Sequence, residues 1–370
     1  MGPTRAYIDH SCLVHNLNLI QKAVSPSKVM AVVKAEGYGH GSVEAAQSVL
    51  KNGAEYLGVA FAEEGIILRE AGITAPILVF GAQLPEYLED QVKHNLEITV
   101  SAEWQIKPLR QICRKLDKKA QIHIKLDTGM GRVGFHPEQL DIAENIFAEP
   151  YFEIIGVYSH LSSSDEEDLD YTRMQAAELK KLQKIIKEKY KKPLLFHLAN
   201  SGAIMRLPEA YFDMVRPGVM LYGNPPGPDF PLSWPLKEVM RFVSKIAVVK
   251  ELQAGKPVSY SRRYHTKEKT KIGVIPAGYA DGYNRLLTNK GQVLIGGKRY
   301  QAAGTVCMDQ FMVDLGWNTN VRPGDEVVLL GRQGDEHVTN VEMSRQLKTI
   351  PYEITCNISA RVPRVHINKN

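Results

Sequence analysis

A lone lysine ends an apolar run near the start of the chain. Residues 29–33 read Val-Met-Ala-Val-Val, which is typical of a fully buried parallel strand, and Lys34 follows directly. Burying an ammonium group without an obvious charge partner is costly, so such a lysine tends to lose its proton or to form an imine. Lys34 is therefore either a candidate Schiff-base lysine or a side chain that extends from a strand end into water.

Polar residues also end further short apolar runs. Together with Lys34, polar residues follow five different runs: Lys34, Lys125, Asp127, His160, His197, Asn200, Ser201 and Arg216. In a β/α barrel the chemistry lies at the carboxyl ends of the strands. If these runs are strands of one barrel, we expect the side chains to converge on one rim.

The runs alternate with amphipathic stretches between residues 29 and 221. Strands are predicted at Val29–Val33, Tyr56–Ala60, Pro76–Phe80, Leu96–Val100, Gln121–Leu126, Phe152–Ser159, Leu194–Leu198 and Met214–Arg216. Helices are predicted from about Ser42 and at Ala62–Ala71, Pro85–His94, Ala102–Leu116, Pro137–Ala148 and Asp168–Tyr190. This α/β alternation predicts a closed (β/α)₈ TIM-type barrel, with a doubly wound open sheet as the alternative.

A proline-rich stretch at residues 224–235 predicts a domain boundary. Beyond it lie β-rich runs separated by glycine turns, at Phe242–Val249, Lys271–Ile275, Gln292–Ile295, Phe311–Leu315 and Glu326–Leu330, and one helical stretch, Asn340–Leu347. We predict an N-terminal strand within residues 1–8 that pairs either with the C-terminal domain or with the barrel. The barrel is predicted over residues 9–230, and a mostly β C-terminal domain over residues 231–370.

The loops after the seventh and eighth runs suit a phosphate group. Barrels often bind phosphate there through backbone N–H groups and small hydroxyl residues, and residues 200–202 (Asn-Ser-Gly) and Gly218-Val219 fall in these loops. Ser201 either contacts phosphate or caps the following helix. An imine-forming lysine together with a phosphate site suggests pyridoxal phosphate. Residues 37–41 lack the GxxxxGK[ST] spacing, which excludes a P-loop.

Composition narrows the class of protein. The 370 residues carry a mild net charge of +5, which suits small anionic ligands, and no basic stripe with interleaved aromatics indicates nucleic acid. The four cysteines are far apart and form no CxxC pair, so we predict no metal site. Residues 1–9 lack an apolar signal core and no window reaches transmembrane length, so we expect a cytoplasmic protein.

With these residues in place, the chain closely resembles the pyridoxal-phosphate-dependent alanine racemases, nearly from end to end. The resemblance rests on seven motifs in order: residues 34–41 (KAEGYGHG), 125–134 (KLDTGMGRVG), 197–202 (HLANSG), 216–223 (RPGVMLYG), 278–283 (GYADGY), 307–309 (CMD) and 351–353 (PYE). It implies a barrel and a C-terminal β domain, a homodimer with active sites shared across the interface, and interconversion of L-alanine and D-alanine for peptidoglycan.

The resemblance also implies roles for individual residues. Lys34 and Tyr260, the latter from the partner subunit, act as bases on opposite faces of Cα, which is what racemisation requires. Arg132 and the Met308 backbone hold the substrate carboxylate. The implied cofactor contacts are Lys34, Tyr38, His160, Asn200, Ser201, Arg216, Gly218, Val219 and Tyr352. His197 contacts Arg216, and His160 donates or accepts a hydrogen bond with Tyr260. The entrance to the active site is formed by Asp165, Tyr279 and Arg285. Cys307 and Asp309 are the remaining motif positions.

Lys125 resembles a lysine that is carbamylated in many relatives, which would turn repulsion by Arg132 into an ion pair. The alternative is an exposed lysine at a strand end. The chain departs from the family pattern at Glu36, at Ser261-Arg262-Arg263 and at Thr305. The last two departures lie where relatives build the entrance, so a broad-specificity racemase acting on serine or other small amino acids is the nearest alternative. A non-catalytic pyridoxal-phosphate homeostasis protein is a second alternative, although it would leave the C-terminal domain and Tyr260 unexplained.

Overall fold

The computed structural model describes residues 2–231 and 233–369. The chain forms two compact units. The barrel unit comprises Val14–Leu221 and Phe230–Pro235, and the C-terminal unit comprises Met1–Leu13, Tyr222–Asp229 and Leu236–Asn370. The first strand of the chain, β1 (Arg5–Asp9), therefore belongs to the C-terminal unit, where it pairs with β10 and β20.

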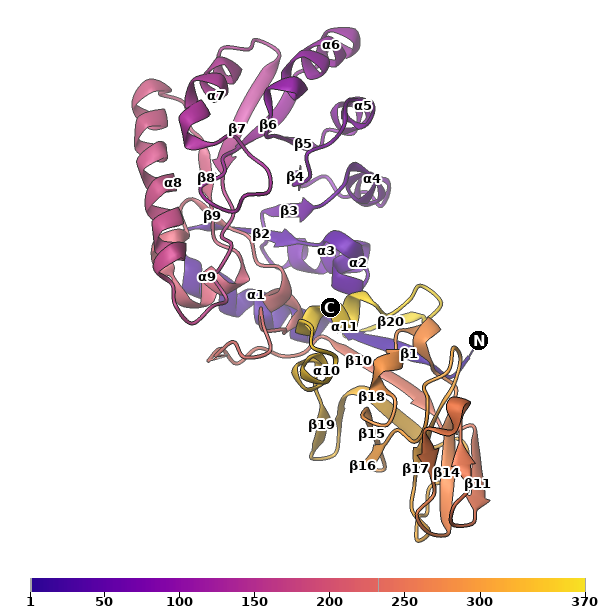
Figure 1. The fold of residues 1–370 in the computed structure, drawn as a ribbon. Helices are drawn as coiled ribbons and strands as arrows, with labels where there is room; N and C mark the ends of the chain where they lie inside the picture. The colour runs from indigo at the N-terminus through magenta and orange to yellow at the C-terminus, as the bar shows by residue number, and fades with distance from the viewer. Residues whose placement is uncertain (1, 232, 370) are drawn as a thin grey trace. The chain divides into compact units, whose positions relative to one another are not determined.

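Eight parallel strands close the barrel (Figure 1). They are β2 (Lys28–Val32), β3 (Tyr56–Val59), β4 (Ile77–Val79), β5 (Glu97–Val100), β6 (Ala120–Lys125), β7 (Phe152–Tyr158), β8 (Leu195–His197) and β9 (Met214–Val215). The ring closes where β9 pairs in parallel with β2. The predicted (β/α)₈ barrel is confirmed, and the doubly wound sheet is excluded.

Side chains fill the interior of the barrel. Successive residues of a strand point to opposite faces, so every second residue points inward. Met30, Leu78, Tyr158 and Met214 form a buried cluster there. The same periodicity brings polar residues inward: Glu97 and Thr99 on β5, and His123 and Lys125 on β6, are all buried.

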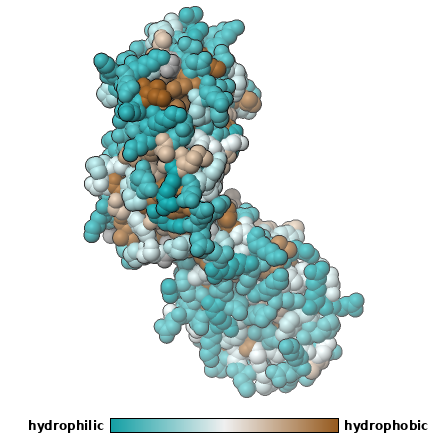
Figure 2. Space-filling model, turned by 60° about the vertical axis from the view of Figure 1, so that its left-hand side comes forward, coloured by the Kyte–Doolittle hydropathy of each residue, from teal (hydrophilic) through white to brown (hydrophobic). Residues whose placement is uncertain are grey.

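Helices surround the strands (Figure 1). They are α1 (His10–Val24), α2 (Lys34–Gly39), α3 (Ser42–Lys51), α4 (Ala62–Glu70), α5 (Pro85–Lys93), α6 (Ile106–Leu116), α7 (Leu140–Phe147), α8 (Asp170–Lys189) and α9 (Ser201–Arg206). Apolar side chains gather in patches on the visible face of the barrel unit in Figure 2, whereas that of the C-terminal unit is mostly hydrophilic. In residues 2–231 and 233–369, no helix is long and apolar enough to cross a membrane.

The C-terminal unit is mostly antiparallel β structure. Its main sheet has the order β16-β15-β18-β10-β1-β20, with β19 paired to β18, and smaller sheets have the orders β11-β14-β17 and β12-β13. The strands are β10 (Met240–Lys245), β11 (Val248–Leu252), β12 (Pro257–Val258), β13 (Tyr264–His265), β14 (Thr270–Ile275), β15 (Gln292–Ile295), β16 (Lys298–Gln301), β17 (Phe311–Asp314), β18 (Glu326–Gln333), β19 (Glu336–Val338) and β20 (Arg364–Ile367). Two helices, α10 (Asn340–Leu347) and α11 (Pro351–Cys356), complete the unit.

The single strand predicted at Phe242–Val249 is wrong. The run contains the end of β10 and the start of β11, which belong to different sheets. Between them the backbone changes partners: Ile246 donates its N–H to the carbonyl of Asp325, and Ala247 donates to that of Val274. The apolar run does not reveal such a change, because Ile246, which is buried, and Val248, which is 47% exposed, are both apolar.

Candidate active site

Lys34 begins a backbone turn of unusual handedness at the carboxyl end of β2. Residues 35–38 all have left-handed backbone angles, with φ between 51° and 58°. Three of them are not glycine, and such a conformation costs roughly 1–2 kcal/mol per residue for an L-amino acid. Strain of this size persists where the surrounding structure enforces it, and it clusters at functional sites. The backbone beside Lys34 is therefore held in place.

Glu64, on α4, holds the turn from outside. Its carboxylate accepts hydrogen bonds from the backbone N–H of Ala35 at 2.7 Å, of Ala60 at 2.6 Å and of Phe61 at 3.2 Å. One side chain thus joins the Lys34 turn to the loop after β3. At the other end of the turn, Glu36 lies 3.4 Å from both the backbone nitrogen and the hydroxyl of Ser42, the first residue of α3. Glu36 is one of the three places at which the sequence departs from the pattern of the family that it resembles.

Asp127 shapes the loop that carries Arg132. Its carboxylate accepts from the backbone N–H groups of Gly129 at 2.9 Å, Met130 at 2.7 Å and Gly131 at 3.2 Å, and from that of Arg132 at 3.2 Å. Although burial alone would raise the pKa of Asp127, these donors and the charge of Lys125 lower it. An ionised Asp127 thus fixes the backbone of Arg132, whose side chain is exposed.

Lys125 lies inside the barrel and is only 3% exposed. The alternative of an exposed lysine at a strand end is therefore wrong. Its Nζ lies 4.7 Å from the centre of the Tyr158 ring and 3.5 Å from the carbonyl oxygen of Leu126. Burial, followed by the charge of Arg216, lowers the pKa of Lys125 well below its ordinary value, opposed by Asp127. Its amine is thus biased towards the neutral, nucleophilic form.

Arg216, just beyond β9, is buried, and its guanidinium donates hydrogen bonds to several neighbours. Nη1 donates to Nδ1 of His197 at 2.9 Å, and Nη2 donates to the carbonyl oxygens of Ser159 at 2.8 Å and Leu198 at 2.9 Å. Burial lowers its pKa to about 10. Arg216 therefore stays protonated at neutral pH, with its guanidinium plane fixed.

The environment of His160 shows that several cations lie close together. Its Nδ1 lies 3.3 Å from Nη2 of Arg216. Burial and then the charges of Arg216, Lys125, Arg132 and Lys34 lower its pKa well below the ordinary value. Four cationic side chains from the carboxyl ends of β2, β6 and β9 thus act on one imidazole, as the predicted convergence on one rim requires. A site of this charge suits an anionic ligand.

The residues around the start of α9 are the next part of the candidate site. Asn200, not Ser201, caps α9: its side-chain oxygen accepts from the backbone N–H of Ala203 at 3.2 Å, so the interpretation of Ser201 as the helix cap is wrong. Ser201 Oγ accepts from the backbone N–H groups of Gly218 at 3.0 Å and Met220 at 3.3 Å. Among the described residues, none accepts the Ser201 hydroxyl proton, which is left for a ligand oxygen.

Tyr38 reaches the same place from the turn after β2. A Cβ atom at Gly218 would lie 2.5 Å from the Tyr38 hydroxyl oxygen, so only glycine allows this approach. Val219, the next residue, is buried. The structure thus brings together four of the residues expected to hold a phosphate: Tyr38, Ser201, Gly218 and Val219.

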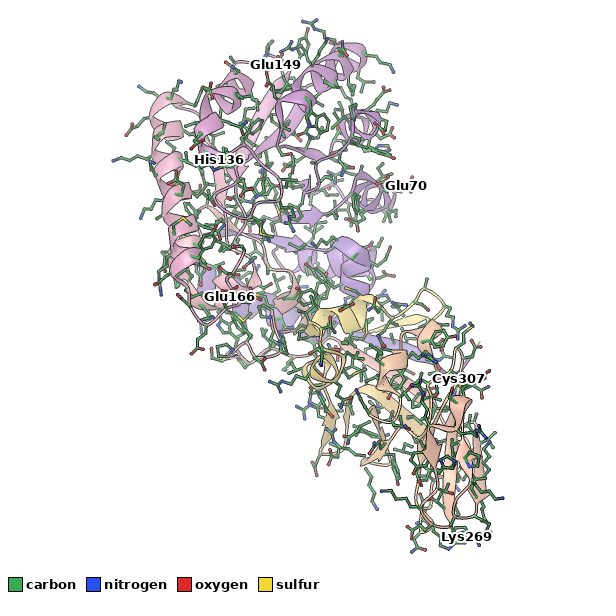
Figure 3. The ribbon with its side chains drawn as sticks, in the orientation of Figure 1. Glu70, His136, Glu149, Glu166, Lys269 and Cys307 are labelled. Carbon is green, nitrogen blue, oxygen red and sulfur yellow. The ribbon has the colours of Figure 1, made fainter. Side chains whose placement is uncertain are left out.

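Tyr260 lies on a strained turn of the C-terminal unit and is 70% exposed. Ser259, Ser261 and Arg262 all have positive φ. Thr305 holds the turn from beneath: it is 1% exposed, and its hydroxyl donates to the Tyr260 carbonyl at 2.8 Å. Thr305, one of the departures from the family pattern, therefore anchors Tyr260 and exposes almost none of its own surface. Ser259 also lies 3.4 Å from the Sγ atom of Cys307, which is labelled in Figure 3.

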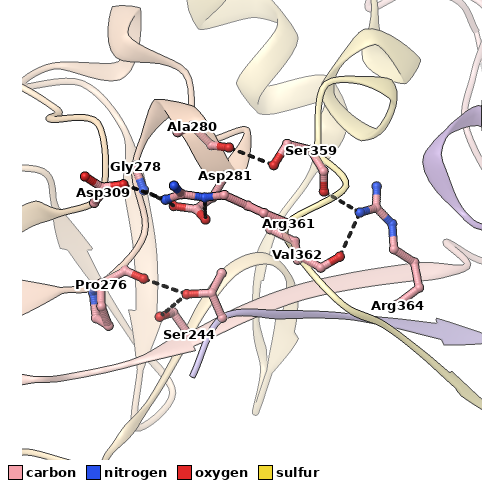
Figure 4. Close-up of polar contacts among 11 residues, drawn as sticks. Ser244, Pro276, Gly278, Ala280, Asp281, Asp309, Ser359, Arg361, Val362 and Arg364 are labelled. Atoms are coloured by element: carbon pink, nitrogen blue, oxygen red, sulfur yellow. Dashed lines mark hydrogen bonds and ion pairs between the residues drawn. The ribbon is translucent and has the colours of Figure 1, made fainter. Parts of the chain in front are cut away.

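Arg361 joins two loops of the C-terminal unit (Figure 4). It contacts both carboxylate oxygens of Asp281, at 2.7 and 2.9 Å, and Asp309 at 2.8 Å. Between these anchors, Ala280 donates its backbone N–H to the carbonyl of Met308 at 3.1 Å. The loops that carry Tyr279 and Met308 are thus held as one rigid piece.

The remaining predicted residues occupy simpler positions. Asp165 is exposed in the loop after β7, and Arg285 is exposed in the C-terminal unit. Tyr352 is half-buried on α11. Several interior residues were not predicted from the sequence, above all Tyr158, whose ring stacks on His197 at 4.7 Å between centroids. The sequence does contain a pattern that could have revealed these interior residues: polar or aromatic residues at every second position of the buried strands.

A closed parallel barrel with cations gathered at one rim, followed by a β domain, defines a two-domain β/α-barrel protein whose rim suits an anionic ligand. A family model for the alanine racemase N-terminal domain matches residues 8–226, and one for the alanine racemase C-terminal domain matches residues 239–366. The chain therefore belongs to the alanine racemase family.

Full-length relatives agree with this assignment. An alanine racemase of Carboxydothermus hydrogenoformans is 43% identical and covers 99% of this chain and 100% of that protein. The crystal structure of an alanine racemase from Streptomyces lavendulae superposes with a TM-score of 0.94 at 35% identity, covering 100% of this chain and 98% of that one. A histidine racemase of Leuconostoc mesenteroides aligns with a TM-score of 0.89 at 25% identity, covering 99% and 98% of the two chains.

Proposed function

We propose that this protein interconverts L-alanine and D-alanine, with pyridoxal 5′-phosphate as its cofactor. The observation that carries the proposal is the gathering of Lys34 with three further cations on one rim, in a chain of the alanine racemase family. The product D-alanine would supply peptidoglycan synthesis in the cytoplasm.

The residues present fit this cofactor. Lys34 would bind its aldehyde carbon, Arg216 would face the ring nitrogen, and the phosphate would lie among Tyr38, Asn200, Ser201, Gly218, Val219 and Tyr352. The hydroxyl proton of Ser201 and the close approach at Gly218 support the phosphate assignment. When bound, pyridoxal phosphate withdraws electrons from the substrate and makes its Cα proton acidic. Arg216 would donate a hydrogen bond to the ring while keeping its own proton.

Two bases on opposite faces of Cα would move the proton. Lys34 takes or returns it on one face, and Tyr260 does so on the other. His160 would hydrogen-bond Tyr260 and take part in its proton transfer, since burial and then the surrounding cations lower its pKa and favour its neutral form. Arg132 and the backbone N–H of Met308 would hold the substrate carboxylate, with Arg132 oriented by a carbamate on Lys125.

We also propose that the working unit is a homodimer in which Tyr260 of one copy completes the site of the other. Tyr260 is 70% exposed, and Leu286 and Met308, in the same unit, expose more than half of their apolar side chains. Their exposure leaves these side chains available to a second copy of the chain. Asp165, Tyr279 and Arg285 would line the entrance formed by the two copies.

The direct test is to add L-alanine and D-alanine separately to the purified, cofactor-loaded protein and to follow chiral conversion. Both enantiomers should reach the same racemic mixture, because a racemase changes rates but not the equilibrium. Tyr260→Phe should retain the cofactor absorbance and impair Cα proton removal from one enantiomer far more than from the other. Equal losses for both enantiomers, or no loss, would contradict the two-base assignment.

A broad-specificity amino-acid racemase is the second candidate. It is favoured by Arg262 and Arg263, which are exposed beside Tyr260 where the family usually has small residues. One methylene in an apolar pocket discriminates by only about 1–3 kcal/mol, so 2-aminobutyrate is a realistic competitor. Such a pocket also rejects an added hydroxyl, as in serine, by only about 10²-fold. Running the chiral assay with serine and 2-aminobutyrate alongside alanine decides between the candidates through the ratio of kcat/KM values.

A further inference from the structure

A continuous line of hydrogen bonds crosses the interior of the barrel. Arg216 Nη1 lies 2.9 Å from Nδ1 of His197, whose Nε2 lies 2.9 Å from Nδ1 of His123. Nε2 of His123 lies 2.7 Å from the carboxylate of Glu97. These four side chains come from the ends or interiors of β5, β6 and β8 and from the residue after β9. We call them the Glu97 relay.

The direction of every hydrogen bond in the relay is fixed by its two ends. An arginine has only donors, so Nδ1 of His197 must accept, and its proton must be on Nε2. That proton is donated to Nδ1 of His123, which in turn carries its own proton on Nε2. The His123 proton is donated to Glu97, an acceptor when ionised. Both imidazoles are therefore neutral, and each has a single allowed tautomer.

Glu97 is 3% exposed, and an isolated buried carboxylate would be very costly. Two neighbouring groups lie within reach of its charge. Its charge acts with burial to raise the pKa of Tyr56 to about 12, and it opposes the effect of burial on the pKa of Arg69. Arg69 is itself fixed by four backbone carbonyls, at 2.7 to 3.1 Å. Glu97 thus has a cation near it and a second one, Arg216, at the other end of the relay.

The strands are shaped to make the relay possible. The pairing of β6 with β7 shifts by one residue between Ile122 and His123, so that His123 lies opposite Gly156. A Cβ atom at Gly156 would lie 2.7 Å from Nδ1 of His123, the atom that accepts from His197. On the other side, the Tyr158 ring stacks on His197 with only 3° between the planes. Both imidazoles are therefore confined.

We propose that Glu97 is a positioning residue for Arg216, acting through His123 and His197. It fixes the His197 tautomer, so that Nδ1 of His197 is always available to accept a hydrogen bond from Arg216. It also supplies a negative charge that favours the protonated guanidinium. The inference rests on the proposed function, since Arg216 is expected to face the ring nitrogen of the cofactor. Without the relay, the imidazoles can exchange tautomers and Arg216 loses its fixed orientation.

The first test reads the tautomers directly. In ¹⁵N–¹H spectra of the histidine rings, recorded on the full chain before cofactor is added, His123 and His197 should both show the neutral Nε2–H form. The chain has 11 histidines, so single His→Gln variants assign the signals. Glu97→Gln keeps an acceptor oxygen and should preserve both tautomers, whereas Glu97→Leu should leave His123 in a mixture. A wild-type His197 protonated on Nδ1, or on both nitrogens, would overturn the proposal.

The second test uses the cofactor-loaded enzyme. Glu97→Leu should lower kcat roughly tenfold with little change in KM for alanine and shift the cofactor absorbance, and Glu97→Gln should recover most of the loss. Glu149→Gln is the matched control: Glu149 is also a buried glutamate of the barrel unit, labelled in Figure 3, but its partner is Arg110, outside the relay. If both glutamine and leucine variants behave like the control, Glu97 does not act on Arg216. If the wild-type protein racemises nothing, the proposed function fails while the spectra still decide the relay.

Discussion

At the scale of single residues, burial decides what the cations can do. Arg216 and Lys125 both lie inside the barrel, yet their environments differ. Arg216 donates to several acceptors and remains charged, whereas the Nζ of Lys125 has one distant carbonyl and the face of Tyr158. A neutral lysine amine beside an arginine can add to carbon dioxide, releasing a proton and forming a carbamate anion that pairs with the cation.

Carbamylation of Lys125 is therefore the first prediction. With ¹³C-labelled bicarbonate at mildly alkaline pH, the cofactor-loaded protein should give a ¹³C carbamate signal that disappears on acidification. The signal should be absent in Lys125→Gln and present in Lys34→Ala, which keeps Lys125. No signal in the wild-type protein, or one that persists in Lys125→Gln, would exclude a carbamate at this residue.

The depressed pKa of Lys125 also makes a prediction about stability. The amine is protonated more readily in the unfolded chain, at its ordinary value of 10.5, than in the folded one. Between the two pKa values the unfolded state binds more protons, so folding becomes more favourable as pH rises. In buffers free of carbon dioxide, the free energy of unfolding of the wild type should therefore rise relative to that of Lys125→Met from neutral pH towards 10.5. Urea titrations at a series of pH values measure it, and a pH-independent difference would contradict it.

At the scale of elements, the left-handed turn at residues 35–38 is the feature that positions Lys34. Its strain has to be offset by surrounding hydrogen bonds, and Glu64 provides one of them together with two to the neighbouring loop. Glu64→Ala leaves these N–H groups without their charged acceptor. It should lower the free energy of unfolding by about 2 kcal/mol and weaken cofactor retention. Glu63→Ala, an exposed neighbour, should change neither; chemical unfolding and dialysis against cofactor-free buffer measure both effects.

A second element, the Tyr260 turn, depends on the hydroxyl of Thr305. Thr305→Val keeps the shape of the side chain but leaves the Tyr260 carbonyl without its donor, at a cost of about 1 kcal/mol. Because the turn itself is strained, we expect kcat to fall more than the stability does. Thr305→Ser retains the hydroxyl and should recover most of the rate. Equal kcat values for Thr305→Val and the wild type would show that the turn holds without this contact.

The elements also show which features a sequence can reveal. The boundaries of the eight barrel strands were predicted to within a residue or two, because buried parallel strands have the sequence pattern of short apolar runs. Helix α1 was not predicted, although Leu13, Leu17, Ile20 and Val24 have helical spacing. The left-handed turn at residues 35–38 was not predicted either, since the glycines at positions 37, 39 and 41 indicate a flexible backbone but not its handedness. Glu97 and His123 were missed because only the closed barrel reveals that these polar residues point inward.

At the scale of the whole molecule, the proposed machinery is divided between the two units. Lys34, Arg132 and Arg216 belong to the barrel unit, whereas Tyr260 and Met308 belong to the C-terminal unit. The rim residues could be predicted because one unit gathers them from its own strands. The identity of the copy that supplies Tyr260 is a property of the assembly, which a single chain's strand pattern does not encode.

A subunit complementation experiment tests whether Lys34 and Tyr260 of one active site come from different copies of the chain. Lys34→Ala and Tyr260→Phe should each be nearly inactive alone, but a mixed dimer of the two contains one site with an unaltered Lys34 from one copy and an unaltered Tyr260 from the other. With random pairing, half of the dimers are mixed and half of their sites are intact, so co-expression should restore about one quarter of the wild-type rate. Co-expressing Lys34→Ala with a Lys34→Ala/Tyr260→Phe double variant controls for assembly and should restore nothing. If the first pair also restores nothing although mixed dimers are isolated with two affinity tags, then both residues act within one chain.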